Sequence, residues 1–124
     1  MTVIDRLAQV RAPIALQVIG ETQNVLWRKF KFSTQEAAAI GREMFLTFPL
    51  IAPAAADVEI ALSFLSTGRL GYWDALLVST VGRAGCTALL TEVMQDGATV
   101  LGVEIVNPFG PSGLSARAAE LLSA

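Results

Sequence analysis

The residues best suited to chemistry in this chain are carboxylates. Its 124 residues include eleven Asp and Glu, nine Lys and Arg, a single Cys and no His. The lack of histidine removes the usual general base of serine and cysteine hydrolases and the commonest zinc ligand. Carboxylate oxygens are the ligands that Mg²⁺ and Mn²⁺ prefer, and such ions activate water for phosphodiester hydrolysis. Glu21, Asp74, Glu92 and Asp96 are the acids whose positions favour such a site.

Glu21 and Asp74 are each predicted on an apolar helix. Apolar residues recur at three- and four-residue steps from Gln17 to Phe30, and Glu21 falls along that stripe. Asp74 opens a helix expected over residues 72–84, which is apolar on nearly every side. Ordinary roles stay open for both acids, because Glu21 can reach water from the edge of the stripe and Asp74 can favour the helix dipole.

Glu92 and Asp96 follow the compact apolar run Thr87–Thr91, which is of strand length. Open α/β sheets bind ligands at the carboxyl ends of their parallel strands, so this location favours a site. The alternative is a solvated polar turn of the kind that follows most strands. Together with Glu21 and Asp74, these acids could converge on one Mg²⁺ or Mn²⁺ ion.

The remaining pattern predicts one α/β domain over residues 1–124, without repeats or a shift in composition. A helix should begin at a Ser33–Glu36 capping box and end near Phe48, before Pro49. The other expected elements are a short strand or helix lead-in over 12–16, a strand over 50–53, a helix from Asp57 to Ser66 ended by Gly68, a strand over 100–106 and a helical tail over 112–124. Helices that alternate with strands indicate a parallel sheet buried on both faces.

Composition limits the classes of function. Hydrophobic residues make up 53% and charged residues 16%, which excludes a disordered chain and predicts self-association of surplus apolar surface. A formal charge of -2 gives no bulk attraction for phosphate backbones, so RNA binding would need a local patch.

The aromatic residues Trp27, Tyr72 and Trp73 are expected in the core or an interface, with base stacking as the alternative. Cys86 has no partner for an internal disulfide, and the chain carries no secretory start and no run of spanning length, so we expect a cytoplasmic protein without membrane association.

Four segments carry a resemblance to a known family: Gln17–Glu21, Gly71–Leu77, Leu89–Gly97 and Val106–Phe109. In order and spacing, the chain from 17 to 109 resembles PIN domains, the ribonuclease toxins of many bacterial toxin–antitoxin pairs. The resemblance implies a three-layer α/β sandwich with a mostly parallel sheet. It also implies an acidic cleft that holds Mg²⁺ or Mn²⁺, an RNA substrate and an antitoxin that blocks the cleft. Glu21 matches the second acid of the family and Asp74 the third.

The chain also departs from the family pattern. It starts after the first, central strand, which ends in an Asp-Thr-Asn-type motif and supplies the first acid. Thr91-Glu92-Val93 places a valine where the fourth acid stands, with Glu92 or Asp96 as substitutes. The losses imply weak or absent nuclease activity, and the alternative function is a degenerate PIN-like interaction module.

The missing strand leaves three explanations open: a misassigned start, a shortened chain, or a remnant completed by a partner. Backbone groups beside an absent central strand need partners. We therefore expect a homodimer, in which a second copy exchanges the segment before Gln17 or the tail after Phe109.

Overall fold

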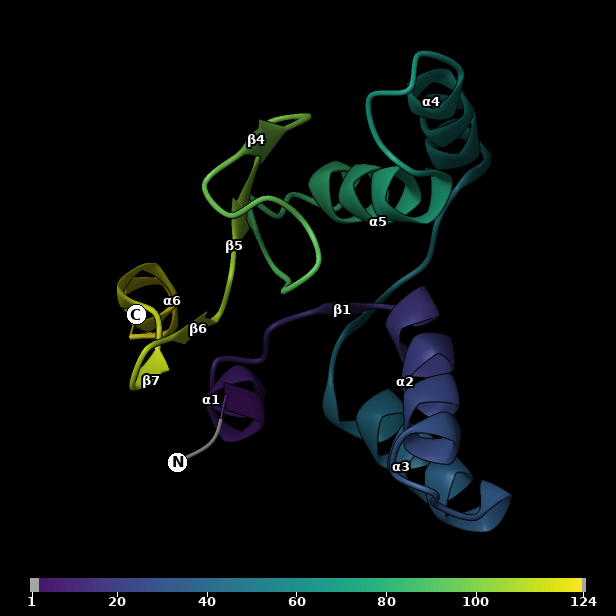
Figure 1. The fold of residues 1–124 in the computed structure, drawn as a ribbon, viewed down its shortest axis with the longest axis vertical. Helices are drawn as coiled ribbons and strands as arrows, with labels where there is room; N and C mark the ends of the chain where they lie inside the picture. The colour runs from purple at the N-terminus through teal and green to yellow at the C-terminus, as the bar shows by residue number, and fades with distance from the viewer. Residues whose placement is uncertain (1–2, 124) are drawn as a thin grey trace.

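The computed structural model describes residues 3–123. Figure 1 shows the arrangement of its helices and strands. The helices are α1 (Val3–Gln9), α2 (Leu16–Arg28), α3 (Thr34–Thr47), α4 (Ala55–Ser66), α5 (Tyr72–Arg83) and α6 (Ala116–Leu122). The strands are β1 (Ile14–Ala15), β2 (Leu50–Ile51), β3 (Ala88–Leu90), β4 (Thr99–Val100), β5 (Val103–Val106), β6 (Phe109–Gly110) and β7 (Gly113–Leu114). The mixed α/β class predicted from the sequence is confirmed.

Helices α2 and α3 pack against each other at one end of the molecule (Figure 1). The predicted capping box begins α3, because Ser33 Oγ accepts a 3.0 Å hydrogen bond from Glu36 N and Glu36 Oε1 accepts one of 3.0 Å from Ser33 N. Each bond satisfies a backbone N–H that has no partner inside the helix. The hydrogen bonds to Ser33 lower the pKa of Glu36. The local sequence alone thus fixes where α3 begins.

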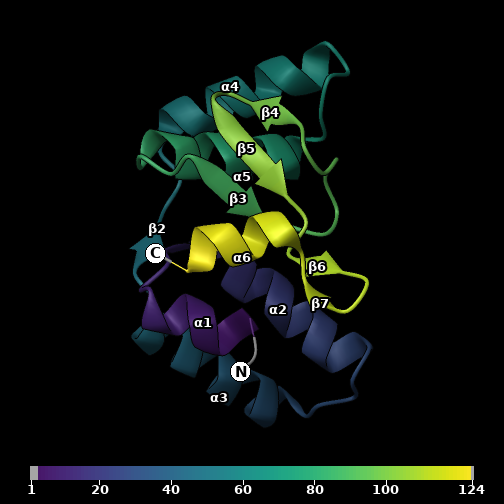
Figure 2. The same ribbon diagram turned by 90° about the vertical axis from the view of Figure 1, so that its left-hand side faces the viewer.

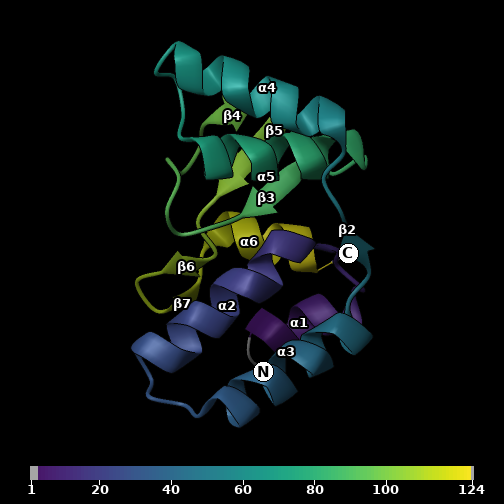
Figure 3. The same ribbon diagram turned by 90° about the vertical axis from the view of Figure 1, so that its right-hand side faces the viewer.

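Helix α5 lies between α4 and the three-stranded sheet (Figures 2 and 3). One side of α5 packs on α4 through Ala75 and Leu76, which contact Ala61 and Phe64 in a buried cluster. The other side meets the sheet in a core that contains Val78, Val81, Val103 and Ile105. This explains why the sequence of α5 is apolar on nearly every side, as predicted.

The largest sheet has the strand order β3-β5-β4. Strand β3 pairs with β5 in parallel, with Leu89 opposite Ile105. Strand β4 pairs with β5 in antiparallel, with Val100 opposite Val103. The strand predicted over 100–106 is therefore confirmed only over 103–106, because Val100 belongs to a separate strand, β4. Leu101 and Gly102 have φ values of 51° and 77°, so they form the two-residue turn of a hairpin between β4 and β5.

The strands of residues 3–123 do not join into one sheet. Strands β1 and β2 form a separate parallel ladder, with Ile14 opposite Leu50, and β6 and β7 form a separate antiparallel ladder. Residues 12–16 were predicted as either a short strand or the lead-in to a helix. Both predictions hold in part, because Ile14–Ala15 is a strand and α2 begins at the next residue. Each strand of the β1–β2 ladder has two residues, too few to be stable without packing from helices.

The chain ends differ from the expected pattern. Helix α1 was not predicted, and α6 begins at Ala116 after a Ser115 cap instead of near Ser112, because the β6–β7 hairpin occupies residues 109–114. Arg117 of α6 holds the carboxylate of Glu104 on β5 through hydrogen bonds of 2.8 to 3.1 Å. In the part of the chain that the structure describes, no helix is long and apolar enough to cross a membrane.

Candidate functional site

Gln17 links α2, which carries Glu21, to the start of α5, which carries Asp74. The side-chain Nε2 of Gln17 donates to Glu21 Oε1 at 3.2 Å and lies 3.3 Å from the carbonyl oxygen of Trp73, to which it also donates. Asp74 follows Trp73 in the first turn of α5, after Gly71 as the N-cap. Gln17 thus connects the second-acid position of the resemblance to the residue beside the third.

Exposure differs between the two acids. Glu21 is exposed to solvent, as the ordinary reading of its place on the stripe predicts, and Asp74 is half-buried. Gln17 was not recognised as a site residue, although the four-residue spacing of Gln17 and Glu21 on a helix is a signal for their contact. The hydrogen bond from Gln17 to the carbonyl oxygen of Trp73, 56 positions away, could not be predicted from any pattern in the sequence.

Glu92 and Asp96 lie beyond the end of β3, as predicted. Glu92 is exposed. Asp96 Oδ1 accepts a 2.8 Å hydrogen bond from the backbone N–H of Asn107, so this carboxylate fixes the chain where β5 ends. Val93, which the resemblance sets at the fourth acid, is 81% exposed, and its backbone N–H donates to Thr91 Oγ1 at 3.3 Å. The strand end therefore carries two acids, of which one has a structural partner.

The four predicted acids do not form one cluster. Among residues 3–123, no group of three or more His, Cys, Asp or Glu side chains is placed to hold a metal ion. Mg²⁺ often binds through one or two carboxylates and keeps waters and substrate phosphates as its other ligands. Glu21 and Asp74 fit such an open site in donor type, but their number is below that of a closed carboxylate cage.

Asp57, which the sequence placed only at a helix start, is a buried acid with hydrogen bonds to three different residues. Its side chain is 1% exposed and accepts hydrogen bonds from Ser79 Oγ at 2.7 Å, Arg83 Nε at 2.9 Å and Ala54 N at 2.7 Å. Burial opposes ionisation, but the hydrogen bonds and the Arg83 charge outweigh it and lower the pKa of Asp57. These contacts join α4 to α5, so we assign Asp57 a structural role.

Two exposed tryptophans lie near the candidate site residues in the sequence. Trp73, next to Asp74, is 63% exposed and makes an edge-to-face contact with Tyr72 at 5.0 Å. Trp27 is 57% exposed and lines a hollow at the end of α2 with Arg28, Lys31 and Phe32. Of the expected places for Trp27 and Trp73, the core is therefore excluded, and an interface or base stacking stays open.

No protein-family model and no curated protein sequence matches this chain. The class that the fold defines is a mixed α/β protein with a small parallel and antiparallel sheet. The site adds Glu21, which Gln17 links to the backbone of Trp73, the residue before Asp74.

Proposed function

We propose that this chain is a PIN-like, metal-dependent ribonuclease of the toxin type, with weak activity. The observation that carries the proposal is the double hydrogen bond of Gln17, which links Glu21 on α2 to the turn of α5 that holds Asp74. Glu21 and Asp74 are 53 positions apart in the sequence, and they match the second and third acids of the family that the chain resembles. Bound Mg²⁺ or Mn²⁺ would supply an activated water and charge neutralisation for phosphodiester hydrolysis. Glu21 and Asp74 would hold the ion, and Gln17 would orient Glu21.

A PIN-like sandwich without its central strand is part of the same proposal. Support comes from the two parallel ladders, β1–β2 and β3–β5, which are separate in the described chain. In a mostly parallel sheet, one further strand between β1 and β3 would join them.

Surface features support RNA as the substrate. The hollow lined by Trp27, Arg28, Lys31 and Phe32 combines cations with aromatic rings, as single-stranded nucleic-acid sites do. It supplies the local positive patch that the overall charge of -2 does not. Trp73 offers an exposed ring beside Asp74 for stacking a base.

Cleavage of labelled RNA with Mg²⁺ or Mn²⁺ tests the proposal. We expect slow cleavage that is lost in Asp74→Asn and kept in Glu59→Gln, an exposed acid of α4 that serves as the control. Cleavage that Asp74→Asn leaves unchanged would refute the assigned site.

A second function, a non-catalytic module that binds an antitoxin-like helix or its own copy, has its own support. Val93 is 81% exposed where the family has an acid, and Asp96 is bound to Asn107. Calorimetric titration with Mn²⁺ separates the two functions. A Kd below about 1 mM would mean that a metal site persists and would favour the enzyme.

A further inference from the structure

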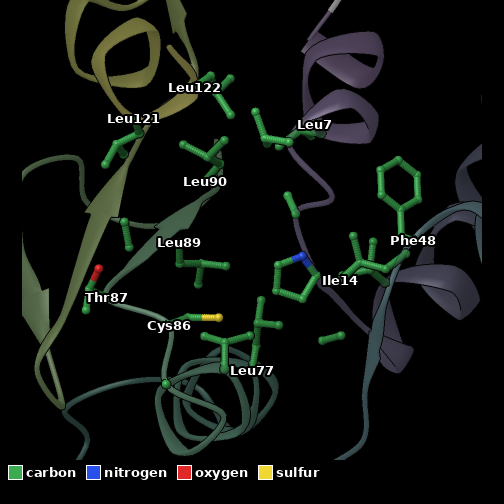
Figure 4. Close-up of a pocket in the computed structure, with 18 of the residues that line it drawn as sticks. Leu7, Ile14, Phe48, Leu77, Cys86, Thr87, Leu89, Leu90, Leu121 and Leu122 are labelled. Carbon is green, nitrogen blue, oxygen red and sulfur yellow. The ribbon is translucent and has the colours of Figure 1, made fainter. Parts of the chain in front are cut away.

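An apolar cavity separates the β1–β2 ladder from β3 (Figure 4). Its volume is about 500 Å³, within the range of peptide and ligand sites. One wall contains Ile14 of β1 and Phe48, and the opposite wall contains Leu89 and Leu90 of β3. Among the described residues that line it, none is charged. An occupant must therefore be uncharged where it enters the cavity, because an ion there would lose its hydration without a partner.

Strand β3 is the edge of its sheet on the cavity side. Thr87 O accepts from Glu104 N at 2.9 Å, and Thr91 N donates to Val106 O at 3.0 Å, so these backbone groups face β5. Alternate residues of a strand direct their backbone groups to opposite sides. The N–H and C=O groups of Ala88 and Leu90 therefore face away from β5, on the side of the cavity that both residues line.

Strand β1 presents a matching edge. Ile14 N donates to Pro49 O at 2.9 Å, so Ile14 faces β2. By the same alternation, the carbonyl of Pro13 and the N–H of Ala15 face the other way, and both residues line the cavity. The cavity is thus bordered on two opposite sides by strand edges with backbone donors and acceptors.

The other two sides of the cavity determine which kinds of side chain an occupant can carry. Leu77 of α5 lies on one side, and Leu7 of α1 with Leu121 and Leu122 of α6 lies on the other (Figure 4). A strand placed between β1 and β3 would direct successive side chains to these two apolar faces. Its sequence must then be a continuous apolar run, as in buried parallel strands, and not an alternating one.

We propose that this cavity binds an extended, uncharged, continuously apolar strand of another polypeptide, which pairs with β3 and β1 at once. Affinity comes from main-chain hydrogen bonds to Ala88 and Leu90 on β3, and to Pro13 and Ala15 at β1. Specificity comes from the apolar side chains on the other two sides of the cavity. The bound strand joins the two ladders into one sheet. The proposal rests on the same gap between the β1–β2 and β3–β5 ladders as the proposed PIN-like sandwich, but strand binding does not depend on Glu21 or Asp74 and is tested separately from RNA cleavage.

A fluorescent peptide with the core Val-Ile-Val-Leu-Val, flanked by glycine and lysine for solubility, is the probe. Fluorescence anisotropy should show saturable binding to the full chain. A peptide with the same side chains but N-methylated alternate backbone nitrogens should bind at least about tenfold more weakly, because it lacks strand donors. A peptide with the alternating core Val-Ser-Val-Ser-Val should also bind at least about tenfold more weakly, because its hydroxyls would be buried unpaired.

A pair of edge prolines tests the location. Ala88→Pro removes the N–H that faces the cavity and keeps the bonds of Thr87 and Thr91 to β5, so the variant should fold. Thr99→Pro is the matched control on β4, the opposite edge of the same sheet, because Ala98 O accepts from Ile105 N and Thr99 therefore faces away from β5. We expect about tenfold weaker peptide binding in Ala88→Pro and unchanged binding in Thr99→Pro, with thermal melts to confirm that both variants fold.

Several results would overturn the proposal. Equal binding of the N-methylated peptide would show an apolar-molecule pocket without strand pairing. Equal loss of binding in both proline variants, or none in Ala88→Pro, would remove the β3 edge from the site. Failure of the apolar peptide to bind a chain that sedimentation shows to be dimeric would assign the cavity to a second copy instead.

Discussion

The side-chain amide of Gln17 donates to the carbonyl oxygen of Trp73 at 3.3 Å, across 56 positions of sequence. Because the same nitrogen also binds Glu21, Gln17 sets the position of that carboxylate relative to α5. Partners that orient a metal ligand commonly account for tenfold or more of the affinity.

If Glu21 and Asp74 hold a metal ion, Gln17→Ala should weaken Mn²⁺ binding by about tenfold, measured by calorimetry. Gln35→Ala, an exposed glutamine on α3, is the control and should leave the affinity unchanged. An unchanged affinity in Gln17→Ala would mean that Gln17 does not position Glu21 for a metal.

Asp57→Asn should destabilise the fold by about 2–4 kcal/mol in urea unfolding. The change removes the negative charge that Arg83 contacts at 2.9 Å, and it leaves one of the three donors to the buried carboxylate without a matching acceptor. Glu59→Gln, an exposed acid on the same helix, should change stability by less than about 0.5 kcal/mol. Similar effects of the two substitutions would contradict a structural role for Asp57.

The stability contributed by Asp57 should depend on pH. Its pKa in the folded chain is lowered from the ordinary value of 3.8, so the unfolded state binds more protons in acid. The contribution is complete above the unfolded pKa and is lost as the pH falls through the folded pKa. Urea unfolding at stepped pH should therefore show an acid slope that is shallower in Asp57→Asn, and an identical slope would be inconsistent with the lowered pKa. Glu104 has a pKa lowered by its hydrogen bonds to Arg117 and should retain its part of the slope.

Gly20→Ala should stabilise the chain by about 0.5–1 kcal/mol. Gly20 lies inside α2, and a Cβ at this position would meet no atom within 4 Å. The gain comes from the lower backbone entropy of the unfolded alanine variant.

Gly102→Ala should have the opposite effect, a loss of about 1 kcal/mol, because φ at Gly102 is 77° in the β4–β5 turn. Chemical unfolding of both variants measures the contrast. Stabilisation by Gly102→Ala would refute the two-residue turn.

We expect the chain to form a homodimer, since large apolar side chains remain exposed. Phe30 is 62%, Leu46 76% and Trp73 63% exposed. Sedimentation equilibrium over about a hundredfold dilution, with melting temperatures at each concentration, measures the association. A well-folded monomer of 13.1 kDa with a constant melting temperature would exclude it.

The sequence by itself determined the local features of this protein. The Ser33 box, the apolar stripe of α2, the helix over 72–84 and the strand after Gly85 all depend on residues a few positions apart, and each is found close to its predicted range. The hairpin at Leu101–Gly102 was missed because Leu101 is an unusual residue for a positive φ, so the run read as one strand.

Only the tertiary structure decided which of these elements meet. Asp57 is a first-turn acid in the sequence, and its burial follows from Ser79 and Arg83 on another helix. Gln17 reaches Trp73, Asp96 turns to Asn107, and the edges of β1 and β3 border one apolar cavity. These relationships depend on how helices pack around strands, and packing energy is summed over many residues that no local pattern brings together.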